Sequence, residues 1–166
     1  MPPMSARRWG AVAAIVVLTV AGDRATKHLA TRRLAGAAVR SYLSDTVRVE
    51  YTENRGGFLG LGATLPSPVR TAVFTAGTLA LLAVVSAVLA RRGTGTAATV
   101  GLSLLWAGGA SNLADRVARG AVVDFLNLGL GPLRTGIFNL ADVAITAGVL
   151  ILLLAPRRTR PARTPP

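Results

Sequence analysis

Long uncharged apolar blocks constrain the fold of this chain more than any other feature of its sequence. Residues 71–90 and residues 93–114 carry no charged side chain, and residues 135–155 carry a single one, Asp142. A helix needs about 20 mostly apolar residues to cross the hydrocarbon core of a bilayer. We therefore predict three membrane-spanning helices here, the last of them stopped by Pro156, which cannot continue a helix interior.

A fourth apolar segment lies near the amino end of the chain. Residues 9–22 alone are too short to span, and they reach spanning length only if residues 23–30 continue the same helix. The preceding Arg7 and Arg8, with the small residues 20–22, also fit a cleaved signal peptide. We favour the uncleaved interpretation, because three further spans make a cleavable leader unnecessary. Four spans place both ends of the chain on the same side of the membrane.

Composition supports a membrane protein and limits its chemistry. The chain has 166 residues, of which 51% are hydrophobic and only 16% are charged, and its net charge is +12. The basic residues lie at the edges of the apolar blocks and in the tail, so the expected partners are membrane lipids with anionic headgroups, not nucleic acid. With no cysteine and a single histidine, His28, the chain cannot form a disulfide, a cysteine nucleophile or a thiolate metal site. Carboxylates, hydroxyls or lysine must carry any chemistry, and we predict neither a metal nor a cofactor.

The distribution of basic residues predicts the orientation. The amino end, the loop between the second and third spans, and the tail contain arginine but no acid, so they are expected to be cytoplasmic. We expect residues 1–156 to form one integral membrane domain, and residues 157–166 to form a basic, disordered cytoplasmic tail. The acidic residues then fall at or near the outer face: Asp23, Asp45, Glu50, Glu53, Asp115, Asp124 and Asp142.

One stretch between the first two spans has strand character. Val47, Val49 and Tyr51 alternate with charged residues, which is the period-two pattern of a half-buried strand. Glycines follow Asn54 and allow a bend or hairpin there. The predicted fold is therefore an all-α membrane protein, a four-transmembrane-helix bundle with a small extracytoplasmic β-sheet between helices 1 and 2, at about residues 38–62.

Several polar residues lie where apolar ones are expected. Asp23 and Lys27 are four residues apart, so they share a helix face and can form either a structural ion pair or a catalytic couple. An ionisable residue inside a span costs roughly 2.5 to 3.5 kcal/mol on insertion scales and usually marks function. A further stripe with a spacing of three and four contains Asn112, Asp115, Arg116 and Arg119. Asp115 and Arg116 could either end the third span or orient a site.

Asp142 has no basic neighbour in sequence, and Asn139 precedes it by three residues. The segment 125–136 is short and contains Pro132, so it is expected to bring Asp124 close to Asp142. Two buried carboxylates held together would share one proton near neutrality. Such a pair suits aspartyl hydrolysis, in which one member takes a proton from water and the other polarises the scissile carbonyl.

Five short motifs follow one another along the chain. They are DRATK at 23–27, NRGGF at 54–58, AGGASNLADR at 107–116, VVDF at 122–125 and FNLAD at 138–142. In this order, the motifs resemble those of the prolipoprotein signal peptidases (signal peptidase II), bacterial aspartyl proteases of the cytoplasmic membrane. Any one match is weak, but five in order are specific.

The resemblance implies a reaction and a set of site residues. The reaction is removal of the signal peptide from a lipoprotein precursor by cleavage before a diacylglyceryl-modified cysteine, near the extracytoplasmic face of the bacterial cytoplasmic (inner) membrane, by a monomer. The resemblance makes Asp124 and Asp142 the catalytic residues. It places Asn54 in a loop that closes on substrate, and Asp23 with Lys27 at the outer edge of the site. The full set of supporting residues is Asp23, Lys27, Asn54, Gly56, Asn112, Asp115, Arg116 and Asn139.

Alternatives remain open at this point. The loop at Asn54 is one residue shorter than usual in the family, and Ala107 and Ser111 replace glycines, so a weakly active paralogue is one alternative. A small membrane transporter is another, because intramembrane acids also build ion pathways. A Ser–Lys protease is a third, with Lys27 as the base and a serine nucleophile. The candidate serines are Ser41, Ser44 and Ser111.

Overall fold

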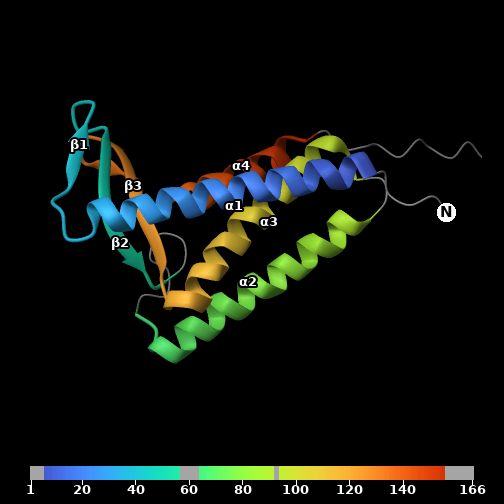
Figure 1. Ribbon diagram of the computed structural model, residues 1–166, viewed down its shortest axis with the longest axis horizontal. Coiled ribbons are helices and arrows are strands. Elements are labelled where there is room, and N and C mark those ends of the chain that lie inside the picture. Colours follow the sequence, from blue (N-terminus) through green and yellow to red (C-terminus); the bar gives the residue numbers. More distant parts are fainter. Residues whose placement is uncertain (1–5, 57–63, 92–93, 156–166) are drawn as a thin grey trace, which may run out of the picture.

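The computed structural model describes residues 6–56, 64–91 and 94–155. Within these residues, helices lie alongside one another and an antiparallel sheet covers one end of them (Figure 1). The helices are α1 (Ala6–Leu34), α2 (Ser67–Ala90), α3 (Thr96–Arg119) and α4 (Leu140–Leu154). The strands are β1 (Arg40–Tyr42), β2 (Val47–Asn54), β3 (Val122–Leu130) and β4 (Leu133–Arg134).

Each predicted span corresponds to a helix, but the first and last residues of the helices differ from those predicted. Helix α1 runs unbroken through residues 23–30, as its spanning length required. Among the described residues, α1 and α2 are long and apolar enough to cross a membrane, whereas α4 is a shorter apolar helix. Helix α3 extends beyond residue 114 to Arg119 and ends at Gly120, whose φ of 71° suits a residue without a side chain. The helix itself therefore continues one turn beyond Asp115.

Helix α4 begins five residues later than the predicted block at 135–155. Asn139 is its N-cap, because the side chain of Asn139 accepts from the backbone N–H of Asp142 and the carboxylate of Asp142 accepts from the backbone N–H of Asn139. This reciprocal arrangement is a capping box. Phe138, the preceding residue, instead exchanges backbone hydrogen bonds with Leu126 of β3. Residues 135–155 carry no charged side chain except Asp142, so their composition does not show where the extended chain ends and the helix begins.

The sheet is larger than predicted and does not lie only between the first two helices. Its strand order is β1-β2-β3-β4, with every neighbouring pair antiparallel, and β3 and β4 come from the segment after α3. This segment had been expected only to return the chain to the last helix. The first four residues of β3 are all buried, so the strand shows no alternation of apolar and polar residues. The predicted glycine-rich bend at 57–62 lies outside the described residues.

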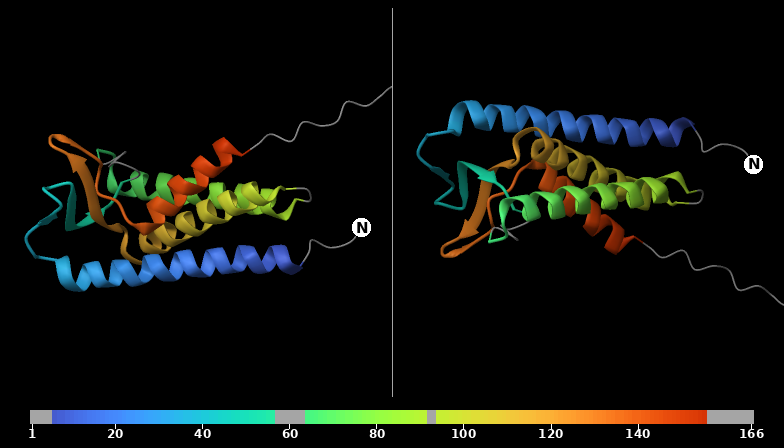
Figure 2. Two further views of the ribbon diagram at one scale, coloured as in Figure 1. Left: turned by 90° about the horizontal axis from the view of Figure 1, so that it is seen from above. Right: turned by 90° about the horizontal axis from the view of Figure 1, so that it is seen from below.

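Helix α3 packs against each of the other three helices, and it approaches α4 most closely. A Cβ atom at Gly108 would overlap the carbonyl oxygen of Ala141, and one at Gly101 would lie 2.9 Å from the carbonyl oxygen of Gly148. Both contacts require glycine, since any larger residue would push α4 away from α3. The two ribbon views in Figure 2 show α3 and α4 crossing beside each other, with the sheet at one end of the bundle.

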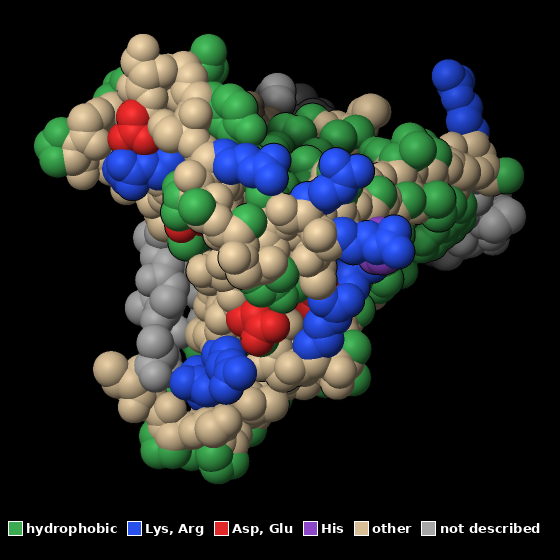
Figure 3. All heavy atoms as spheres, turned by 60° about the vertical axis from the view of Figure 1, so that its left-hand side comes forward, with side chains coloured by type: hydrophobic (Ala, Val, Ile, Leu, Met, Phe, Trp, Pro, Cys, Tyr) green, Lys and Arg blue, Asp and Glu red, His purple; other side chains and the backbone are tan. Residues whose placement is uncertain are grey.

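The sheet is fixed to the end of α1 by a small apolar core. Ala30 and Leu34, in the last two turns of α1, pack against Val123 and Phe125 of β3. The outward faces of the helices, in contrast, remain apolar and uncovered; Val17 on α1, for example, is 63% exposed. Figure 3 shows that charged side chains gather on the sheet end, whereas hydrophobic side chains cover the flank that runs away from it.

Candidate active site

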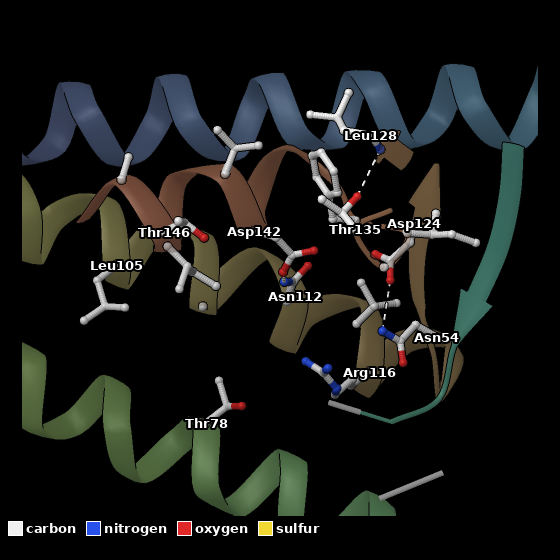
Figure 4. A pocket seen from close by; sticks show the side chains of 18 of the residues that line it. Asn54, Thr78, Leu105, Asn112, Arg116, Asp124, Leu128, Thr135, Asp142 and Thr146 are labelled. Carbon is white, nitrogen blue, oxygen red and sulfur yellow. Dashed lines mark hydrogen bonds between the residues drawn. The ribbon is translucent and has the colours of Figure 1, made fainter. Parts of the chain in front are cut away.

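A cavity of about 830 Å³ lies between α2, α3, α4 and the β3–β4 hairpin. Asp124 and Asp142, the predicted carboxylate pair, both line this cavity and come toward each other from a strand and a helix (Figure 4). Asn54, Asn112 and Arg116 also line it. Most of the remaining wall is apolar and comes from the helices.

Asp124 lies on β3 and is 1% exposed. Asn54 donates its Nδ2 to Oδ2 of Asp124 at 2.9 Å, and Asn139 donates its Nδ2 to Oδ1 at 2.6 Å. Burial and, to a smaller extent, the negative charge of Asp142 raise the pKa of Asp124 to about 6, although the hydrogen bonds from Asn54 and Asn139 act in the opposite direction. Asp124 is therefore poised to change protonation state close to neutral pH.

Asp142 lies in the first turn of α4. Asn112 donates its Nδ2 to Oδ1 of Asp142 at 2.8 Å, and the backbone N–H of Asn139 donates to Oδ2 at 3.1 Å. The amino end of a helix carries partial positive charge, which favours a carboxylate at this position. Both oxygens of Asp142 therefore accept hydrogen bonds, and both donors are electrically neutral.

One residue, Asn139, contacts both carboxylates. Its side-chain amide donates to Asp124, while its backbone N–H donates to Asp142. Asn139 is fully buried, and its side-chain oxygen accepts from the backbone N–H of Asp142, which fixes the orientation of the amide. The orientation of Asn54 is fixed in the same way, because its Oδ1 accepts from the backbone N–H of Gly56 at 2.9 Å. The two carboxylates are thus held by rigid, correctly oriented amides.

Behind the cavity, α1 supplies the predicted ion pair. Lys27 Nζ lies 2.7 Å from Oδ2 of Asp23 and 2.8 Å from Oδ2 of Asp115, and it donates to Oδ1 of Asn112 at 2.8 Å. Asp23 and Lys27 are 0% and 3% exposed and do not line the cavity. They are therefore buried behind Asn112, and the expectation that they shape an outer edge is wrong. Through Asn112, Lys27 is connected to Asp142.

The ion cluster also includes Arg24, which the sequence did not single out, and Ser111, which was expected only as a candidate nucleophile. Arg24 Nη1 lies 2.8 Å from Oδ1 of Asp115, and its Nη2 donates to the carbonyl oxygen of Ser111 at 2.8 Å. The hydroxyl of Ser111 donates to Oδ2 of Asp23 at 2.6 Å. Only the adjacency of Arg24 to Asp23 in the DRATK motif could have pointed to Arg24. Asp115, which is 1% exposed, belongs to this cluster and not to the cavity wall.

Arg116 connects α3 to the end of β2. Its Nη2 donates to the carbonyl oxygen of Gly56 at 2.9 Å, and its guanidinium carbon lies 5.8 Å from the centre of the Phe74 ring on α2. Asn54 is the last residue of β2, so it belongs to a strand end and not to the predicted loop. The remaining motif residues, 57 and 58, lie outside the described part of the chain. Arg119, the fourth residue of the predicted stripe, is exposed to solvent.

The geometry bears on which chemistry the site can perform. In the described ranges, no three His, Cys, Asp or Glu side chains come together in a way that could hold a metal ion. Lys27 contacts two carboxylates, and Ser111 donates to Asp23 instead of Lys27. Ser41 donates to Asp45 on the surface. These contacts do not form a serine–lysine couple, whereas Asp124 and Asp142 line one cavity.

Taken together, apolar outward faces on the helices and a polar centre buried at one end of the bundle define a helical membrane protein with an enclosed carboxylate site. A family model described as signal peptidase (SPase) II matches residues 15–156. The chain therefore belongs to the signal peptidase II family.

Relatives and solved structures agree with this assignment. The chain is 33% identical over 147 residues to a lipoprotein signal peptidase of Streptococcus pneumoniae (strain ATCC BAA-255 / R6), covering 87% of this chain and 90% of the relative. It is also 33% identical over 156 residues to one of Burkholderia mallei (strain SAVP1), covering 93% and 91%. A bacterial membrane enzyme solved by the in meso method at 2.3 Å resolution is similar in fold, with a TM-score of 0.77, 26% identity and coverage of 88% and 87%.

Proposed function

We propose that this protein is an aspartyl endopeptidase of the bacterial cytoplasmic membrane, and that it removes the signal peptide from diacylglyceryl-modified prolipoproteins. Cleavage occurs immediately before the lipidated cysteine, and Asp124 and Asp142 are the catalytic residues. The observation that carries the proposal is that these two carboxylates, Asp124 buried and Asp142 partly buried, line one cavity and are bridged by Asn139. The family assignment and the name of the relatives, lipoprotein signal peptidase, support the same substrate class.

In the proposed reaction, the carboxylate pair shares one proton. The ionised member takes a proton from a water molecule, whose oxygen attacks the carbonyl carbon of the scissile peptide bond. The protonated member donates its proton to the carbonyl oxygen, and a tetrahedral intermediate forms. When the intermediate collapses, the carbon–nitrogen bond breaks, and the proton taken from water passes to the departing amine. One hydroxyl group of the intermediate returns its proton to the other carboxylate, so the pair again shares one proton. No covalent bond forms between enzyme and substrate.

The neutral donors around the pair suit this proton exchange. Asn54, Asn112 and Asn139 orient both carboxylates without neutralising them, whereas a bound cation would hold both permanently ionised. Ser111 and Ala107, which replace glycines of the family motif, are buried in the helix packing outside the cavity lining. These departures leave the carboxylate pair intact, which favours an active enzyme over a weakly active paralogue.

The proposed membrane position follows from helix lengths. Helix α4 has 15 residues and is about 22 Å long, about 8 Å less than the thickness of a bilayer core of about 30 Å. If its carboxyl end marks the cytoplasmic boundary, its amino end, where Ala141 lies, is about 8 Å below the outer boundary. On α1, the exposed face becomes basic at His28, about 7.5 Å along the helix from Asp23. Asp23 accepts from the backbone N–H of Ala141 at 3.0 Å, so both estimates give the same depth.

At this depth, the site meets a substrate that is itself in the membrane. The proposal therefore has four spans, cytoplasmic termini, and the sheet at the extracytoplasmic surface. The apolar cavity wall from α2 and α4, with residues such as Leu81 and Leu150, suits a signal helix and acyl chains. Arg8 at the opposite end of α1 donates to the carbonyl oxygens of Leu89 and Arg91, so basic residues cluster at the proposed cytoplasmic end.

The test is cleavage of a purified, lipidated prolipoprotein in detergent or liposomes. Replacing Asp124 or Asp142 with asparagine is expected to lower kcat by at least about 100-fold, since each variant removes one acid–base group. Both variants should remain inserted and folded, because asparagine preserves the shape of the side chain. Glu53→Gln is the matched control, since Glu53 is an exposed carboxylate on β2, and it should keep full activity. Full activity in both aspartate variants would rule out the proposed mechanism.

A further inference from the structure

The β3–β4 hairpin forms the wall of the cavity at its sheet end. Leu128, Arg134 and Thr135 line the cavity there. Leu128 donates its backbone N–H to Oγ1 of Thr135 at 3.0 Å, which closes the hairpin against the cavity (Figure 4). Arg134 therefore brings a positive charge to a wall that the proposed mechanism does not use. The opposite wall, from the helices, is largely apolar.

The side chain of Arg134 is held in place on three sides. Its Nε donates to Oδ1 of Asn127 at 2.5 Å, and its Nη1 donates to the carbonyl oxygen of Asp45 at 2.8 Å. Gly129 lies opposite Arg134 in the strand register, and a Cβ there would be 2.5 Å from Cγ of Arg134. The arginine thus lies across the glycine, and its side chain is only 14% exposed. Arg48 also donates to Asp45 and holds the pKa of that carboxyl well below its usual range.

The contacts above use two of the three guanidinium nitrogens of Arg134, Nε and Nη1. Nη2 of Arg134 is buried and has no hydrogen-bond partner among the residues that the structure describes. A buried donor without an acceptor costs free energy, and a charged donor costs more than a neutral one. An oxygen that entered the cavity beside the hairpin would satisfy this donor, with a strong charge-assisted hydrogen bond.

We propose that Arg134 is a substrate-binding residue that recognises an oxygen acceptor on the polypeptide segment following the scissile bond. This inference rests on the proposed function. The signal helix and acyl chains fit the apolar wall between α2 and α4, so the segment beyond the cut must leave past the hairpin, where Arg134 lies. The acceptor is either a carboxylate side chain or a backbone carbonyl, and both offer the same chemistry to a guanidinium.

The experiment measures KM and kcat separately for Arg134→Gln and Arg134→Lys on a lipidated precursor. Loss of one charge-assisted hydrogen bond should raise KM by about 10- to 100-fold with little change in kcat. Arg40→Gln is the matched control, because Arg40 is an exposed arginine on β1 and should leave KM unchanged. Gly129→Ala keeps the charge but displaces the side chain, so it should also raise KM.

Substrates with Asp, Asn or Ala in the first residues after the cysteine separate the two acceptors. If the acceptor is a carboxylate, the wild-type enzyme prefers the Asp substrate, and Arg134→Glu shifts the preference to a Lys substrate. If the acceptor is a backbone carbonyl, Arg134→Gln raises KM equally for all three substrates.

The inference is overturned if Arg134→Gln leaves KM unchanged on every substrate. It is equally overturned if kcat and the unfolding temperature fall together with no change in KM, because Arg134 would then only hold the hairpin. Either result leaves the proposed function standing. The proposed function is tested separately, and it fails if the Asp124→Asn and Asp142→Asn variants both keep full activity.

Discussion

Two pairs of carboxylates lie inside this protein, all buried except the partly buried Asp142, and their surroundings are opposite. Asp23 and Asp115 contact cations, since Lys27 lies within 2.8 Å of both and Arg24 lies 2.8 Å from Asp115. Asp124 and Asp142 accept hydrogen bonds from asparagine amides and a backbone N–H, and within the described residues they form no salt bridge. The two pairs are adjacent, because Asn112 contacts both Lys27 and Asp142.

This difference between charged and neutral neighbours determines what each carboxylate pair can do. A carboxylate with a cation beside it stays ionised, so it can hold helices together but cannot exchange a proton easily. A carboxylate that receives only neutral donors in a buried site keeps a pKa close to neutrality, as Asp124 does. The ion cluster is therefore expected to serve folding and the amide-held pair to serve chemistry. Four predictions, ordered by the size of the expected effect, test this division.

The largest effect is expected from Asp115→Asn, which removes one carboxylate from the ion cluster. Removing this carboxylate leaves Arg24 with only its longer contact to Asp23, at 3.7 Å, and leaves Lys27 with one carboxylate instead of two. Breaking a buried ion pair on one side costs about 3–5 kcal/mol, so the unfolding temperature in detergent should fall sharply. The control is Glu53→Gln, where an exposed pair with Arg55 is worth less than about 1 kcal/mol. An Asp115→Asn variant as stable as wild type, but inactive, would abolish the distinction between the clusters.

The second prediction concerns pH and the amide-held pair. The folded pKa of Asp124 lies above the usual value of 3.8, so the protonated form is favoured in the folded protein. The stability that this proton contributes is full below pH 3.8, and it is lost as the pH rises through about 6. The loss amounts to about 2–3 kcal/mol. Unfolding temperatures across pH 4 to 8 should therefore fall more in wild type than in Asp124→Asn, and parallel curves would contradict the assigned shift.

The third prediction changes the spacing of the two acids while keeping all polar groups. In Gly108→Ala, the new methyl group meets the carbonyl oxygen of Ala141, next to Asp142. Overpacking of this kind costs about 1–3 kcal/mol, and it should also lower kcat by moving Asp142 away from Asn112. Gly77→Ala, where a Cβ meets nothing within 4 Å, is the control. Wild-type cleavage by Gly108→Ala would show that the pair tolerates displacement.

The smallest effect is expected on the outside of the bundle. Trp106 Nε1 on α3 donates to the hydroxyl of Ser86 on α2 at 2.9 Å, away from both carboxylate clusters. Trp106→Phe should lower stability by about 0.6 kcal/mol, without changing KM or kcat. A large loss of activity would mean that the contact between α2 and α3 reaches the cavity, and that the two clusters are not the only parts that matter.

The sequence predicted local features well and distant contacts poorly. The spacing of Asp23 and Lys27 predicted their ion pair, and the continuation of α1 followed from the length that a span requires. Strand β3 was missed because it is buried on both faces and shows no period-two pattern. The place of Arg24 was also missed, because its partner Ser111 lies 87 residues away. Convergence of Asp124 and Asp142 in one cavity was expected from the short connection, but the bridge through Asn139 required the structure.

The two acids are mounted on different layers of the molecule, and this arrangement makes bilayer thickness relevant to turnover. Asp124 belongs to the sheet at one end of the bundle, whereas Asp142 belongs to a helix within the bundle. Hydrophobic mismatch is accommodated mainly by helix tilt, which moves the helix-borne acid against the sheet-borne one. Lipids with longer or shorter acyl chains would therefore strain the Asn139 bridge, and the enzyme should work best in a membrane that matches its short fourth helix.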